Sequence, residues 1–329
     1  MMMKSMKKMA LVRQVQMFGS GRRAYYVDTS VGFLLENIER VYHEKRMSGS
    51  PVISEKEFRS QQQLVLSGFY ELYPFQVRYL NDGGVSDFLK RRECDLFGIA
   101  KNPLFYQSDY QSYMVSSIAT KDELVLRGLA LMIYQFTHYY SIEYENWVDG
   151  LLTNYLDKVK AIVQSNRLFR LKVKYPMLGG SISRCRILDV VKVYVEEDSV
   201  VYNLVKQFLY NDFLDSDGED FPLHYMPDLG EITYAFENLL MNEIFEKAFD
   251  QKFPSIHYHR FLDEVLISCT CMEDSILFNE RTLYTLLEEI NLPGDILSIG
   301  PGDYPLSLYN DMYRVKINRD KDVVVYRSC

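Results

Sequence analysis

The sequence predicts an α+β fold, with helices packed on one face of an antiparallel sheet. Three observations predict this class. From residue 184 onward, the expected elements follow one another as strand, helix, helix, hairpin, helix and strands, an order typical of it. Residues 253–271 contain two short apolar strands on either side of the adjacent acids Asp263 and Glu264, which predicts the hairpin. A long helix over residues 231–249 leads directly into that hairpin.

The N-terminal half is expected to be mainly helical. Its clearest helix covers residues 121–140, because apolar residues recur there at helical spacing and acids stand in the first turn. The other elements expected in this half are helices over residues 32–45, 54–72 and 142–164 and a turn at residues 81–84.

The C-terminal half is expected to mix strands and helices. The expected strands are residues 168–175, 184–195, 312–317 and 323–326, and the expected helices, besides the long one, are residues 199–213 and 282–290. Residues 294–305 are rich in Gly and Pro.

The composition is that of a globular protein and argues against a membrane-spanning or secreted one. The 329 residues are 47% hydrophobic and 25% charged, as in a globular protein, and contain no apolar run long enough to span a membrane. The five cysteines are mostly scattered, which indicates a reducing, intracellular compartment such as an organelle or the bacterial cytoplasm. A basic start without a long apolar core is not a secretory signal.

A net charge of −8 counts against a broad nucleic-acid-binding surface but leaves room for a local one. Basic residues gather in three places: the first 25 residues, the run Lys90, Arg91 and Arg92, and the group Arg167, Arg170, Lys172 and Lys174. Such clusters are usually only solvated surface.

The two hairpin acids are the main chemical signal. Adjacent carboxylates inside an apolar hairpin are costly unless a metal ion, a basic partner or water offsets their charge. Phosphoryl transfer with two divalent ions needs such acids on a rigid support. From the hairpin alone, an ordinary turn is the favoured explanation of Asp263 and Glu264, because Asp is common and Glu is tolerated in turns.

Three stretches in this order resemble the palm of reverse transcriptases, especially those of group II introns and related bacterial and organellar elements. The first is a strand-like run with Asp189 and, five residues later, Tyr194. The second is a turn with Pro227, followed by the helix with Asn238 and the stretch 241–244. The third is the hairpin segment 260–267, and residues 120–125 resemble the fingers of the same family.

The resemblance implies a fold with reverse-transcriptase-type fingers and palm and an RNA-directed DNA polymerase activity. It divides the chain into an N-terminal extension, mostly helical and partly basic (1–95), a fingers-like region (96–180), a palm-like region (181–290) and short C-terminal strands without a full thumb (291–329). It implies Asp189, Asp263 and Glu264 as catalytic ligands of Mg²⁺ or Mn²⁺. It implies Tyr194 and Pro227 as nucleotide-binding residues, Tyr194 being the steric gate. RNA is the implied partner, in a mobile-element or related ribonucleoprotein, with Lys90, Arg91 and Arg92 as binding residues.

The chain departs from the family pattern at several positions. Glu264 stands where the family has a second aspartate, and Phe261 replaces the usual tyrosine. The turn after Pro227 is altered, and the fingers arginine, the later palm lysine and the extended thumb are not evident. These departures keep a second interpretation open: a catalytically inactive palm that acts as a structural or RNA-binding scaffold, with a protein partner supplying the thumb or a basic surface. A third interpretation is an unrelated structural protein.

A zinc site is a competing prediction for the hairpin. His257, His259, Cys269 and Cys271 flank it and have the chemistry of zinc ligands. Close ligand pairs usually lie across turns in structural zinc sites, whereas these pairs lie along strands. The favoured explanation is that the histidines are sheet residues and the cysteines are small core residues.

Overall fold

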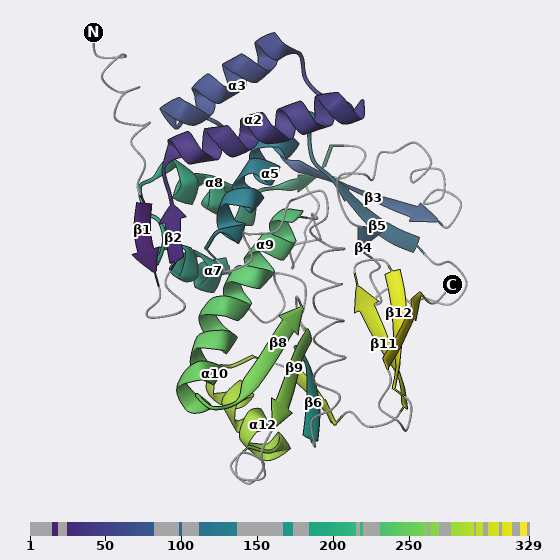
Figure 1. Cartoon of the computed structure of the whole chain (residues 1–329). Helices are drawn as coiled ribbons and strands as arrows, with labels where there is room; N and C mark the ends of the chain where they lie inside the picture. The colour runs from purple at the N-terminus through teal and green to yellow at the C-terminus, as the bar shows by residue number, and fades with distance from the viewer. Residues whose placement is uncertain are drawn as a thin grey trace. The chain divides into compact units, whose positions relative to one another are not determined.

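A computed structural model describes residues 15–18, 25–81, 99–100, 112–136, 167–173, 184–214, 218–219, 231–261, 264–269, 278–292, 294–298, 302–308, 311–317 and 323–327 (Figure 1). The chain forms two compact units. The first comprises Met1–His138 and Met177–Leu239, and the second comprises Tyr139–Pro176 and Leu240–Cys329. Among the described helices, none is both long enough and apolar enough to cross a membrane.

The first unit contains helices and short sheets. Its strands are β1 (Val15–Phe18), β2 (Tyr25–Asp28), β3 (Phe75–Asn81), β4 (Ile99–Ala100), β5 (Ser112–Ser117) and β7 (Phe213–Leu214). Its helices are α2 (Val31–Ser48), α3 (Glu55–Ser67), α5 (Thr120–Tyr134), α7 (Arg184–Val191), α8 (Val200–Leu209) and all but the last residue of α9 (Glu231–Leu240). The strands form the pair β1-β2 and a sheet of order β4-β5-β3-β7, in which β3 and β7 are parallel.

Local sequence sets the ends of α2 and α3. The Ser30 hydroxyl accepts a backbone N–H of the first turn of α2, and Ser54 and Glu57 form a capping box at the start of α3. The two helices end at Gly49 and Gly68, whose φ angles of 71° and 76° lie in the left-handed region that glycine adopts without strain.

Helices α2 and α5 pack closely in the core of this unit. A Cβ atom added at Gly128 of α5 would lie 2.5 Å from Cγ1 of Ile38 and 3.0 Å from its backbone nitrogen. Glycine therefore permits the close approach of the two helices. The fully buried side chains of Leu34, Val41 and Leu129 belong to the same core.

The second unit is built around a four-stranded antiparallel sheet. Its elements are β6 (Arg167–Val173), the π-helix η4 (Met241–Glu246), α10 (Lys247–Lys252), β8 (His257–Phe261), β9 (Glu264–Cys269), α12 (Glu280–Glu289), β10 (Gly294–Ser298), β11 (Gly302–Leu308), β12 (Asp311–Ile317) and β13 (Val323–Arg327). The sheet has the order β10-β6-β9-β8, and a three-stranded sheet has the order β11-β12-β13. Helix η4 follows α9 directly, so the long helix predicted from the sequence is present with a π-helical segment inside it.

The predicted mixture of helices and sheets is present, but the predicted palm sheet is not. Residues 184–195 were expected to form a strand beside the hairpin, and they instead contain helix α7 and a turn. The strand expected over residues 168–175 is confirmed as β6, and this strand is the neighbour of the hairpin. The Gly- and Pro-rich stretch 294–305 contains strand β10 and the start of β11.

Candidate functional site

The hairpin predicted from the sequence is formed by β8 and β9. Its register pairs Tyr258 with Ile267 and Arg260 with Val265. Residues paired across strands lie on the same face of a sheet, and successive residues alternate between faces. These four residues therefore share one face, on which Val265 and Ile267 are fully buried.

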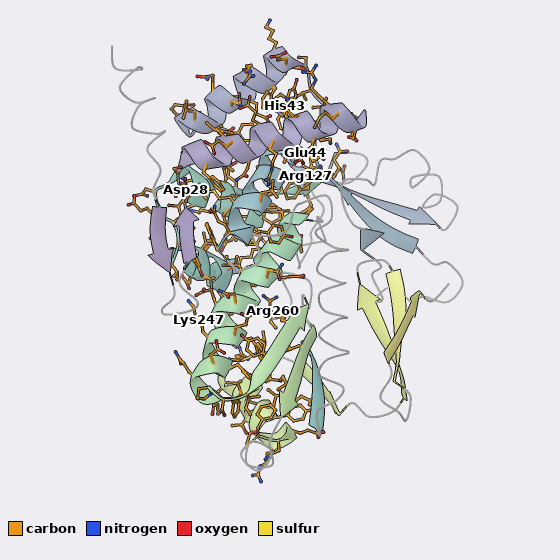
Figure 2. All side chains as sticks on the ribbon, in the orientation of Figure 1. Asp28, His43, Glu44, Arg127, Lys247 and Arg260 are labelled. Carbon is orange, nitrogen blue, oxygen red and sulfur yellow. The ribbon has the colours of Figure 1, made fainter. Side chains whose placement is uncertain are left out.

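Helices of the second unit cover this apolar face. The rings of Phe245 and Phe249 lie 6.2 Å and 5.0 Å from the ring of Tyr258, centroid to centroid. Arg260, which is labelled in Figure 2, is enclosed on the same face. Its Nε donates to Oε1 of Glu246 at 2.5 Å, and the two side chains are 0% and 14% exposed. The long helix thus anchors the hairpin through apolar rings and one enclosed ion pair.

The opposite face of the sheet holds the second set of residues, which includes Glu264. The register places Glu264 of β9 opposite Lys172 of β6, and Lys172 opposite Asp295 of β10. Two positions away on the same face, Arg170 stands opposite Leu266. The strand beside the hairpin therefore offers a cation at the position opposite Glu264.

Asp189 lies on a helix and not on a strand of the sheet. Its side chain is 72% exposed, and the Nζ atom of Lys192 lies 3.9 Å from its Oδ1. The predicted strand is wrong because Ile187, Leu188 and Val191 form the buried side of a short helix, where they are 0%, 8% and 0% exposed. An exposed helical aspartate paired with lysine is ordinary surface chemistry.

Tyr194 is enclosed in the core of the first unit. It is 2% exposed, and its ring stacks on Phe136 at a centroid distance of 4.6 Å and an interplanar angle of 6°. Stacked aromatic pairs of this kind contribute to core stability. Tyr194 is therefore a core residue of the first unit.

The remaining predicted site residues, Asp263, Pro227, Lys90, Arg91 and Arg92, lie outside the described residues.

The register also bears on the alternative zinc site. His257 pairs with Ser268 and His259 with Leu266, whereas Cys269 pairs with Arg167. By the alternation of the strands, both histidines lie on the face of Glu264 and Cys269 lies on the other face. Cys271 lies outside the described residues. In the described part of the chain, no group of three or more His, Cys, Asp or Glu residues could hold a metal ion.

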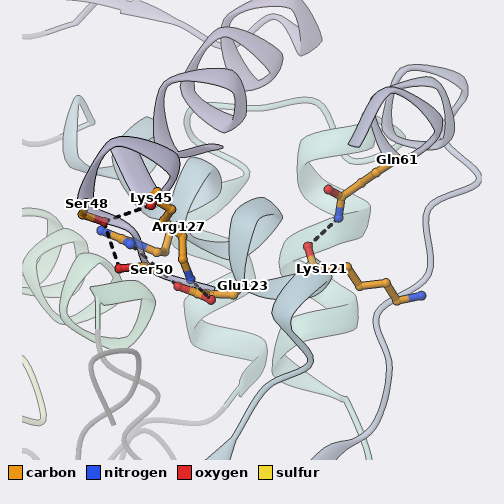
Figure 3. Close-up of polar contacts among 7 residues, drawn as sticks. All are labelled: Lys45, Ser48, Ser50, Gln61, Lys121, Glu123 and Arg127. Atoms are coloured by element: carbon orange, nitrogen blue, oxygen red, sulfur yellow. Dashed lines mark hydrogen bonds and ion pairs between the residues drawn. The ribbon is translucent and has the colours of Figure 1, made fainter. Parts of the chain in front are cut away.

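A buried charge network at the start of α5 was missed by the sequence analysis. Lys45 of α2 donates to Oε2 of Glu123, and the two side chains are 3% and 0% exposed. Arg127, one turn further along α5, lies 3.7 Å from the other carboxylate oxygen (Figure 3). Burial raises the pKa of Glu123, and the charges of Lys45 and Arg127 offset part of that rise.

The neighbouring acid, Asp122, is equally buried and has different partners. The Tyr70 hydroxyl donates to its Oδ1 at 2.5 Å, and the backbone N–H of Tyr73 donates to its Oδ2 at 2.8 Å. Burial raises the pKa of Asp122 to about 6, although the hydrogen bond from Tyr70 and the charge of Lys121 lower it. Burial and the nearby carboxylate also raise the pKa of Tyr70.

The sequence did place Asp122 and Glu123 in the first turn of a helix, where acids favour the helix dipole. The partners Lys45 and Tyr70 are distant in the chain, so no local pattern could reveal the burial of the two acids.

Comparisons with known proteins were made for the whole chain. No family model matches it, and no curated protein matches it. Among solved structures, it is similar to an apo telomerase from Candida tropicalis truncated from its C-terminal domain, with 8% sequence identity and a TM-score of 0.41. The match covers 74% of this chain and 59% of that chain, so this chain spans less than two thirds of the telomerase chain.

Proposed function

We propose that this chain is a non-catalytic, palm-like subunit that binds RNA locally through the sheet face carrying Arg170 and Lys172. The observation that carries the proposal is the register of β6, which places Lys172 opposite Glu264. A cation at this position suits a phosphate ligand better than it suits a divalent ion held between acids.

The absence of nucleotidyl transfer is proposed from the positions of the acids. Two-metal transfer needs carboxylates from neighbouring rigid strands. Asp189 lies on α7 with Lys192 beside it, and the strand next to Glu264 contributes Lys172 at the facing position. The Mg²⁺ or Mn²⁺ implied by the resemblance therefore has no catalytic role in this proposal.

RNA is proposed as the ligand because basic residues occupy every second position along part of β6, a strand in the middle of the sheet. Arg170 and Lys172 occupy the same face of β6. Phosphate contacts by Arg and Lys supply most of the affinity of non-specific RNA binding. With a net charge of −8, such binding is confined to a few contacts. The run Lys90, Arg91 and Arg92 is proposed as a second contact region, and a partner protein that adds basic surface fits the same picture.

The test is a titration of the full chain with a fluorescently labelled single-stranded RNA at several salt concentrations. Arg170→Glu/Lys172→Glu should weaken binding at least about tenfold and reduce the salt slope by about 1.4, because each phosphate contact contributes about 0.7. Lys56→Glu/Lys206→Glu is the matched control, since both lysines are exposed on helices of the first unit. The control should bind as the parent does. Absence of binding by the parent at low salt, or equal losses in both variants, contradicts the proposal.

A further inference from the structure

The segment 69–74, which joins α3 to β3, is held in place by side chains from other elements. We call it the strap. Gln207 of α8 donates to the carbonyl of Tyr70 at 3.0 Å and accepts the backbone N–H of Leu72 at 2.9 Å. Asn211 donates to the carbonyl of Tyr73 at 2.7 Å. Backbone groups that would pair with neighbouring strands in a sheet are paired here with side chains.

Asp122 holds the same strap from the side of α5. Its two carboxylate oxygens accept the Tyr70 hydroxyl and the Tyr73 N–H, and the residue is 0% exposed. The Nζ atom of Lys121 lies 3.2 Å from the centroid of the Tyr73 ring, a cation–π contact. One buried carboxylate therefore bridges two residues of the strap.

Among the described residues of the first unit, several elements contribute polar or charged side chains near Asp122. Gln61 of α3 donates to the Tyr70 hydroxyl at 2.9 Å. The uncharged amides described above come from Gln207 of α8 and from Asn211, which follows that helix. From its own helix come Lys121 and Glu123, and Glu123 is paired with Lys45 of α2 and Arg127. Lys and Arg side chains keep their charge between pH 5 and pH 8. Burial raises the pKa of both carboxyl groups, Asp122 and Glu123, and it is Asp122 that accepts hydrogen bonds from the strap.

We propose that the strap is a pH-dependent latch, held most firmly in mildly acidic solution and released more often as the pH rises towards neutral. This inference concerns the first unit and does not depend on the proposed RNA binding. Strand β3 begins at Phe75, directly after the strap, and pairs there with Phe213 of β7. Release of the strap therefore loosens the start of β3.

The direction of this pH dependence follows from the number of protons that the closed and open states bind. In the closed state, burial raises the pKa of Asp122 from 3.8 to about 6. In the open state water reaches the carboxylate, and its pKa returns towards the ordinary value. The closed state therefore binds more protons between these two values. Its added stability is complete below the lower value and is lost as the pH rises through the higher one.

The test is hydrogen exchange of the strap in the full chain, with rates corrected for the intrinsic effect of pH. The amides of Leu72 and Tyr73 report on opening because a side chain accepts each of them. Their protection should fall about tenfold between pH 5 and pH 8 in the parent, since the shift of the pKa of Asp122 from 3.8 to about 6 fixes the ratio. Asp122→Asn should remove this dependence.

Two further variants keep the test decisive if Asp122→Asn folds poorly. Tyr70→Phe removes the hydrogen bond that lowers the pKa of Asp122, so the midpoint of the change should move to higher pH. Gln207→Ala weakens the strap without altering a titrating group, so protection should fall equally at both pH values. Equal corrected protection of the parent at pH 5 and pH 8, or an unchanged midpoint in Tyr70→Phe, overturns the proposal.

Discussion

Lys45 of α2 and Glu123 of α5 form an ion pair that is almost completely enclosed in the first unit, with side chains 3% and 0% exposed (Figure 3). The pair joins two helices whose backbones also meet at Gly128 and Ile38. A buried ion pair gives little net stability, because the loss of hydration offsets its attraction, but the loss of one partner leaves an uncompensated buried charge.

Lys45→Met should therefore lower the free energy of unfolding by about 3–5 kcal/mol at pH 7. The loss should shrink in acid, because the pKa of Glu123 is already raised and the unpaired carboxyl takes up a proton more readily still. Denaturant unfolding at both pH values measures the effect. Arg40→Met is the matched control, since its partner Glu44 lies 3.7 Å away on the surface, and the expected change is below about 1 kcal/mol. Equal losses in the two variants contradict the prediction.

Replacement of both Lys45 and Glu123 separates the attraction between the two charges from the cost of burying one charge alone. Lys45→Met/Glu123→Met removes the two charges together and keeps similar volumes, so its stability should lie close to that of the parent or above it. A double variant that is as unstable as Lys45→Met shows that Arg127 or the packing of α2 on α5, and not the unpaired carboxylate, sets the loss.

Local sequence patterns predicted much of the fold. Apolar residues at helical spacing predicted helices over residues 32–45 and 54–72, and the structure has α2 over Val31–Ser48 and α3 over Glu55–Ser67. The same holds for the hairpin, whose strands alternate between faces around a turn. These features depend on neighbours in the chain, and the sequence contains that information directly.

The site was less predictable, for two physical reasons. Residues 187–191 contain a β-branched run that favours a strand, yet Ile187, Leu188 and Val191 are also spaced for a helix, and burial against the first unit decided between them. The second reason is that the strand beside the hairpin, β6, is distant from it in the chain, so their pairing depends on tertiary structure. The strand with Arg170 and Lys172 was expected, but no local signal pairs Lys172 with Glu264.

Variants of Tyr194 test whether this residue packs the core or recognises a nucleotide. Tyr194→Ala should lower the free energy of unfolding by about 3–5 kcal/mol, because it removes a 2%-exposed ring that stacks on Phe136 and leaves a cavity. Tyr194→Phe keeps the stack and should cost less than about 1.5 kcal/mol. Thermal and denaturant unfolding measure both. A stable Tyr194→Ala variant with altered nucleotide or RNA binding supports the role implied by the resemblance to reverse transcriptases instead.

Arg260 provides a test of how the long helix holds the hairpin. Arg260→Met leaves Glu246 without its partner beneath the sheet, so hydrogen exchange of the Val265 and Ile267 amides should become faster. Arg260→Lys keeps the charge but not the planar guanidinium, and its effect should be intermediate. Lys247→Met is the control, because Lys247 pairs with Glu243 on the same helix with its own side chain 53% exposed. If the control speeds exchange as much as Arg260→Met, the enclosed pair does not anchor the hairpin.

The register of Lys172 and Glu264 predicts both the metal affinity and the activity of the hairpin. Paired positions of an antiparallel sheet have Cβ atoms about 4.5–5.5 Å apart, so we expect a change of charge at position 172 to alter cation binding by Glu264. Lys172→Asp changes the facing charge by two units and should raise affinity for Mn²⁺, measured by water proton relaxation, at least about tenfold. Asp189→Asn should leave that affinity unchanged, because Asp189 lies exposed on α7.

Primer extension by the parent, Glu264→Asp and Asp189→Asn decides whether the chain is a polymerase. The parent and Glu264→Asp should give no extension of a labelled primer on an RNA template with Mg²⁺ or with Mn²⁺, because shortening the acid does not remove the cation opposite it. Extension by the parent that Asp189→Asn abolishes assigns catalysis to this chain and overturns the non-catalytic proposal. Extension by Glu264→Asp alone shows that the side-chain length of Glu264, and not the charge of Lys172, suppresses the reaction, since a shift of about 1 Å in a reacting group can change a rate about a hundredfold.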